Sequence, residues 1–177
     1  WHRDIPACPT KFLPGQFEIQ SCFEGRFGAE SINDMFGSQI MIHAAMQNTA
    51  RAAARIEYVE VTHAGQAFRL GRYPIHFHLN GNISGSYVRG CAIHHTFNRA
   101  VTIHAVNYLL VEKNVAYNIL GHAFFLEDGV EVGNVIQDNS GIFVRASSSL
   151  LNVDITPATF WIVNPNNTVR RNVAAGG

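Results

Sequence analysis

Short runs of alternating apolar and polar residues recur along the chain. Four of them share the order apolar, polar or variable, apolar, polar, and they occupy residues 40–43, 75–78, 101–104 and 124–127. A period of two residues predicts half-buried β-strands, in which the first and third side chains point inward and the second and fourth point outward.

A second repeat follows these runs. It consists of an aliphatic residue, two variable residues, a ladder residue, one spacer, and a small or apolar residue. The repeat starts at Ile56, Val88, Val111, Ile136 and Val169, which gives spacings of 32, 23, 25 and 33 residues. Spacings in the low twenties suit one turn of a parallel β-helix, and the longer two indicate inserted loops.

The ladder residue is Asn114, Asn139 or Asn172 in three copies of this repeat, and Val59 or Cys91 in the others. Stacked Asn side chains can hydrogen-bond from one coil to the next, so we expect them to have a structural role. The sequence therefore predicts a parallel β-helix of about five coils over residues 37–177. Residues 1–36, which are interrupted by Pro and Gly, are expected to be an irregular lead-in or a divergent insertion.

Composition narrows the range of functions. The 177 residues include 13 basic and 13 acidic residues and no cluster of Lys and Arg, which argues against nucleic acid as a partner. No apolar run is long enough to span a bilayer, so we expect no membrane contact from this segment. The chain starts without Met and stops within a repeat, and we therefore expect it to be a fragment of a longer chain. Nine histidines is a high count, and the chemistry of the chain depends on them.

Stacking the four alternating runs in register would build two outward columns about 4.8 Å apart from coil to coil. One column is Met41, His76, Thr102 and Phe125, and the other is His43, His78, His104 and Glu127. We assign His78, His104 and Glu127 as candidate catalytic residues, and His43, His76 and Asp128 as candidate binding residues. Asp128 joins them only if the chain turns at Gly129. Imidazoles beside a carboxylate are compatible with a divalent metal such as Zn, Mn or Fe, with acid–base chemistry, or with a polar packing ladder, and the sequence leaves these alternatives open.

Other candidate sites are weaker. Cys8 and Cys22 could pair in an extracellular setting, whereas Cys91 is expected to be buried. Asn82 and Asn166 begin N-glycosylation sequons in turn-rich loops. A further polar ladder is expected at equivalent places in three coils, namely His63, His95 and Asn118. Four arginines could meet acidic sugars but are expected to form surface ion pairs instead, and these are Arg72, Arg89, Arg99 and Arg145.

Several longer strings resemble the ectodomain of the fibrocystin-L (polyductin-like) family. They are residues 57–61, 63–76, 86–95, 98–104, 123–129 and 160–168, and the resemblance covers roughly residues 36–177. The same region is similar to the cell-surface and cell-migration-inducing hyaluronidases.

The resemblance implies a right-handed parallel β-helix within a very large, single-pass, cell-surface or ciliary glycoprotein. Its expected partners are neighbouring domains of the same chain, glycans or extracellular proteins. Two functions follow, either a structural or adhesive extracellular module or a polysaccharide-degrading enzyme. We favour the module, because the fibrocystin-L resemblance is the closer one and the sequence by itself contains no recognisable catalytic motif.

Overall fold

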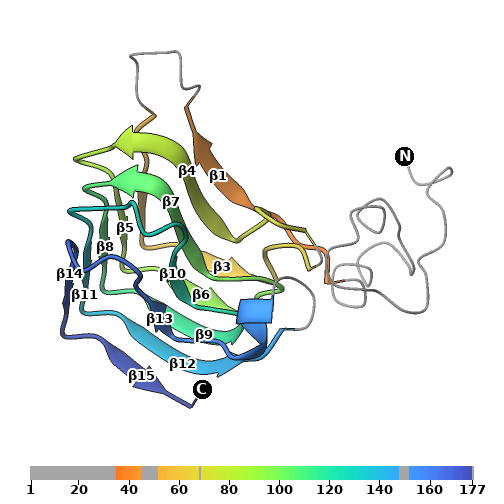
Figure 1. The fold of residues 1–177 in the computed structure, drawn as a ribbon. Coiled ribbons are helices and arrows are strands. Elements are labelled where there is room, and N and C mark those ends of the chain that lie inside the picture. Colours follow the sequence, from red (N-terminus) through yellow and green to blue (C-terminus); the bar gives the residue numbers. More distant parts are fainter. Residues whose placement is uncertain (1–34, 45–51, 68, 148–151, 177) are drawn as a thin grey trace, which may run out of the picture.

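The computed structural model describes residues 35–44, 52–67, 69–147 and 152–176, which form a parallel β-helix (Figure 1). The strands are β1 (Ile40–His43), β2 (Arg55–Glu57), β3 (Glu60–Thr62), β4 (Ile75–Asn82), β5 (Tyr87–Arg89), β6 (Ala92–His94), β7 (Val101–Asn107), β8 (Leu110–Glu112), β9 (Val115–Leu120), β10 (Phe124–Leu126), β11 (Val135–Gln137), β12 (Ser140–Arg145), β13 (Phe160–Trp161), β14 (Thr168–Arg170) and β15 (Val173–Ala175). A short 3-10 helix, η2 (Asn152–Ile155), precedes β13.

Each coil contributes one strand to each of three parallel sheets. The first sheet has the order β1-β4-β7-β10-β13, the second β14-β11-β8-β5-β2, and the third β15-β12-β9-β6-β3. Three consecutive strands therefore make one coil, so β1 to β3 form coil one and β13 to β15 form coil five. The five coils stack along the axis of the solenoid (Figure 1). This arrangement confirms the predicted parallel β-helix.

The register of the second sheet matches the sequence repeat. Ile56 pairs with Val88, Val88 with Val111, Val111 with Ile136, and Ile136 with Val169. Val88, Val111 and Ile136 are fully buried. The repeat thus marks a column of aliphatic side chains that fills the interior of the solenoid, where burial of apolar surface stabilises the stack.

The Asn ladder is also present. The backbone N–H of Asn114 donates to Oδ1 of Asn139 at 3.1 Å, and the N–H of Asn139 donates to Oδ1 of Asn172 at 2.9 Å. Nδ2 of Asn139 donates to the carbonyl of Val111 at 3.0 Å. A second ladder, which the repeat did not reveal, joins Asn134 to Asn167 in the same manner.

A column of left-handed residues bends the chain at the third sheet. Its members have φ between 50° and 56°, and they are His63, His95, Asn118 and Phe143. Asn and His tolerate this region better than most residues, which helps to explain the polar choice at this corner. The His63 and His95 rings stack with centroids 5.7 Å apart. The predicted equivalence of His63, His95 and Asn118 is confirmed.

One outward column is covered by other parts of the chain. His76, Thr102 and Phe125 do point away from the interior, but each is at most 4% exposed. Tyr73 packs edge-on against His76, with ring centroids 4.8 Å apart, and Trp161 stacks near Phe125. From His76 to Phe125 the column is therefore a second buried layer outside the first sheet, whereas Met41 at its start is 40% exposed.

Arg99 corrects the expectation of a surface ion pair. Its guanidinium is fully buried, lies 3.8 Å from the Phe125 ring centre, and makes two hydrogen bonds to the buried Asp154 carboxylate at 3.0 and 2.8 Å. Asp154 belongs to η2, so this pair fixes the segment before β13 onto the outer layer. Arg89, in contrast, is partly exposed and pairs with the carboxylate of the buried Glu112 at 2.7 Å.

The structure leaves some expectations without a test. Cys8, Cys22 and the lead-in up to residue 34 lie outside the described residues. Cys91 is buried and unpaired, as expected. Asn82 ends β4, and Asn166 is exposed before β14. Among the described residues, no helix has the length and apolar character needed to cross a membrane.

Candidate metal centre

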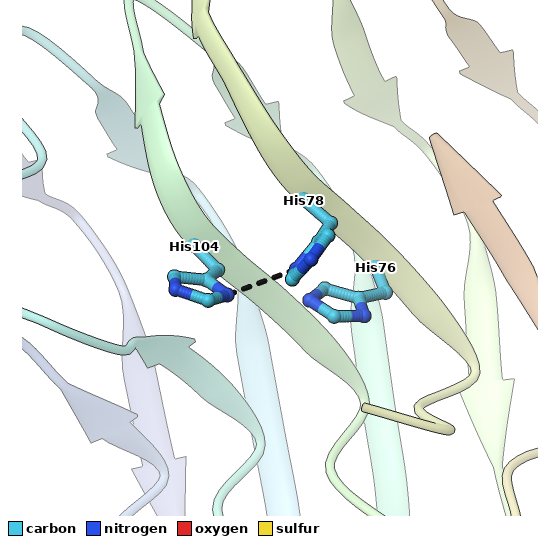
Figure 2. A group of neighbouring side chains, drawn as sticks. All are labelled: His76, His78 and His104. Carbon is cyan, nitrogen blue, oxygen red and sulfur yellow. Dashed lines mark hydrogen bonds between the residues drawn. The ribbon is translucent and has the colours of Figure 1, made fainter. Parts of the chain in front are cut away.

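Three histidines converge on the outer side of the first sheet. His76 and His78 alternate along β4, and His104 lies on β7, where it pairs in register with His78 (Figure 2). His76 pairs with Thr102, yet its ring reaches across to the other two. One ring nitrogen from each histidine lies within 4.8 Å of the others, which is compatible with a shared metal ion.

The rings pack closely around this point. The His78 ring lies 4.8 Å from the His76 ring and 4.7 Å from the His104 ring, measured between centroids, and it is steeply inclined to both. Nδ1 of His78 and Nδ1 of His104 are 2.9 Å apart, so one ring donates a hydrogen bond to the other (Figure 2). A metal bound here would replace that hydrogen bond with coordination.

His76 has the tautomer that a metal ligand needs. Its Nδ1 lies 2.9 Å from the carbonyl oxygen of Gly71, which can only accept, so Nδ1 carries the proton. Nε2 then holds the lone pair, and it is buried without a hydrogen-bond partner among the described residues. Burial lowers the pKa of His76 to about 4, so the ring is neutral at physiological pH.

Carboxylates border the cluster on the side of β10. Nε2 of His104 lies 2.7 Å from Oδ2 of Asp128, and its Nδ1 lies 3.6 Å from Oε2 of Glu127. Asp128 reaches the cluster because the chain turns at Gly129, whose φ is +76°. The contact to Asp128 orients His104, in the way that outer carboxylates orient metal-bound histidines.

Glu127 lies beside His104 but outside the group of ligand atoms that converge within 4.8 Å. Its Oε2 is buried and accepts no hydrogen bond among the described residues. Burial raises the pKa of this carboxyl, although His104 and Arg99 oppose the shift. A divalent cation held by the three histidines would favour the ionised form of Glu127.

His43 is beside the cluster but is turned differently. It continues the column of His78 and His104, and its ring centroid is 5.2 Å from that of His78. Its Nδ1 lies 3.0 Å from the backbone carbonyl of His78, and the residue is exposed. The structure therefore brings His76, His78, His104, Glu127 and Asp128 together, and it places His43 at their edge.

Sequence reasoning missed two residues that hold this site in place. Tyr73 covers His76 and accepts a hydrogen bond from Nη1 of Arg99 at 3.2 Å. Glu131 is buried, and its Oε1 accepts the N–H groups of Ala105 and Asp128. Neither residue repeats from coil to coil, so a search for periodic positions could not find them.

Comparison with known proteins finds a matching family model and several similar sequences. A family model described as the CEMIP beta-helix matches residues 35–177. Human fibrocystin-L is 58% identical over the whole chain, so the similarity also includes the lead-in, and mouse fibrocystin-L is 57% identical. The human cell surface hyaluronidase CEMIP2 is 35% identical over 81% of the chain. The chain spans about 4% of the length of the fibrocystin-L sequences and 12% of that of CEMIP2.

Proposed function

Because the chain belongs to the CEMIP β-helix family, we propose that it is an extracellular β-helix module of a large cell-surface glycoprotein and that it holds a divalent metal at its three-histidine cluster. The observation that supports a metal ion is the Nε2 atom of His76, which is buried beside two further imidazoles and has no hydrogen-bond partner among the described residues. A buried polar atom without a partner costs free energy, and a metal ion would remove that cost.

The residues fit a metal in two further respects. His76 and His104 each contact an oxygen acceptor through the ring nitrogen opposite the one facing the cluster, namely the Gly71 carbonyl and the Asp128 carboxylate. This arrangement fixes ring orientation in known metal sites. Three imidazole nitrogens suit Zn, Mn or Fe, and Glu127 beside His104 would place a negative charge near the ion. The bound ion would link β4 and β7, which belong to neighbouring coils.

The extracellular placement is supported by the relatives. The names of three related proteins include the terms cell surface or cell migration. The sequons at Asn82 and Asn166 agree with a glycosylated extracellular protein, and the resemblance implies a cell-surface or ciliary location. In this setting the module would give length and rigidity, and its outer surfaces would contact glycans, extracellular proteins or neighbouring domains of the same chain.

Metal content tests the proposal directly. We expect the native protein, purified without chelator, to carry one divalent ion per chain by native mass spectrometry and elemental analysis. His76→Ala should reduce occupancy at least tenfold, since one of three imidazole ligands is lost. His94→Ala on the third sheet is the matched control and should keep full occupancy. A metal-free native protein, or equal occupancy in both variants, would disprove the metal centre.

A polysaccharide-degrading activity is the second candidate. The hyaluronidase relatives suggest it, and Glu127 with its raised pKa beside His104 is the observation in its favour, because an acid catalyst needs such a carboxyl. Two observations oppose it. Tyr73 covers His76, and the imidazole of His104 already contacts His78 and Asp128 of the same chain. Hyaluronan depolymerisation that His104→Ala abolishes would support the enzyme, and no cleavage by the native protein would leave the module.

A further inference from the structure

A cavity lies on a different sheet from the metal centre, at the left-handed corner of the third sheet. Its volume is about 320 Å³, at the small end of the range for ligand pockets. Residues from coils one to four line it, among them His63, His95, Phe97, Asn118, Leu120 and Arg145. Neither the metal nor the family comparison accounts for this cavity.

The walls combine apolar and cationic groups. Phe97 and Leu120 supply apolar surface, and the stacked rings of His63 and His95 form one side. Arg145 is exposed, and it makes no ion pair with any residue in the described part of the chain. Among the described residues, no acidic side chain lines the cavity. The site is therefore complementary to a negative charge attached to an apolar group.

An exposed apolar strip continues from the cavity along the third sheet. Tyr117, Ile142 and Phe143 are 42%, 39% and 47% exposed. The Tyr117 ring lies 5.4 Å from the His95 ring and 6.4 Å from the Phe143 ring, so the strip is continuous with the cavity wall. Clustered exposed apolar side chains mark interaction sites, and aromatic residues such as Tyr117 and Phe143 are enriched in protein interfaces.

Asn118 adds an unmet acceptor at the same place. Its Oδ1 is buried and has no hydrogen-bond partner among the described residues.

We propose that this cavity and strip bind an extended, acidic segment of a partner protein. One apolar side chain of the segment enters the cavity between Phe97 and Leu120, and a neighbouring carboxylate pairs with the guanidinium of Arg145. The rest of the segment lies along Tyr117 and Phe143. A sugar ligand is less suited, because it would need more polar partners than these walls offer. The proposal goes beyond the proposed function and does not depend on the metal.

Defined peptides test this site on the native, full-length protein. The probe is a fluorescent nonapeptide with Phe followed by two Asp residues between Ser and Gly spacers, and its control replaces both Asp residues with Lys. We expect the Asp peptide to bind and the Lys peptide not to bind. Arg145→Ala should weaken binding about tenfold, since it removes a charge pair. Phe143→Ser, which shortens the strip, should weaken binding without changing the charge.

Arg170→Ala is the matched control, because it removes an exposed arginine from the second sheet and should leave binding unchanged. Removing the metal with a chelator should also leave peptide binding unchanged, so this proposal and the metal centre can fail separately. Equal binding of both peptides, no binding of either, or no effect of Arg145→Ala would overturn the proposal. So would Arg145-dependent binding of a uronate oligosaccharide in place of the peptide.

Discussion

At the scale of single residues, His76 couples burial to protonation. Its pKa is about 4 in the folded protein and about 6.5 in an unfolded chain, so the unfolded state binds more protons between these values. The stabilising effect of a neutral His76 is complete above pH 6.5 and is lost as the pH falls toward 4. We expect the metal-free protein to lose up to about 3 kcal/mol of unfolding free energy from this source.

Urea denaturation of wild-type protein and of His76→Gln across this pH range measures the effect. Gln has no titrating group, so the wild-type protein should lose more stability on acidification than the variant. Acidic residues titrate in both proteins, and their contribution cancels in the difference. Parallel pH profiles for the two proteins would show that His76 does not titrate in this range.

Arg99 and Asp154 form a buried ion pair with a large expected effect on stability. Both side chains are fully buried, and the guanidinium is held by two hydrogen bonds to the carboxylate. Removal of one partner leaves a buried charge, so we expect Arg99→Met or Asp154→Leu to cost about 3–5 kcal/mol. The double variant should cost clearly less than the sum, because neither charge remains. Additive costs in thermal unfolding would contradict this account.

At the scale of one element, the Asn ladder joins the turns between the second and third sheets. Asn139 accepts two hydrogen bonds from Asn114 and donates to Val111 and Asn172. Asn139→Ala leaves several of these buried groups without partners, and we expect a cost of about 2–4 kcal/mol in urea denaturation. Cys91→Ala, at the same ladder position in the second coil, should cost about 1 kcal/mol. Equal costs would show that the hydrogen bonds of the Asn ladder add no stability beyond that of side-chain packing.

The sequence predicted the parts of the fold that repeat. Strand register, the Asn ladder and the stacking of His43, His78 and His104 all follow from residues at a fixed offset, because one coil places equivalent side chains above each other. It could not predict features made by loops. Tyr73 and Asp154 occur once each and reach the first sheet through segments without periodicity, so the burial of His76 and the pairing of Arg99 had no signal in the repeat.

At the scale of the whole molecule, the fold is a one-dimensional stack of coils. This arrangement determines which pairs of destabilising substitutions affect each other. Every strand pairing inside the three sheets joins neighbouring coils. Val88 in coil two and Val111 in coil three are direct partners, whereas Ile136 in coil four is separated from Val88 by one coil, about 9.6 Å away. In urea denaturation we expect Val88→Ala and Ile136→Ala to destabilise additively within about 0.5 kcal/mol. Val88→Ala and Val111→Ala share a cavity wall and should depart from additivity by about 1 kcal/mol. Similar coupling in both pairs would mean that the coils respond as one rigid core.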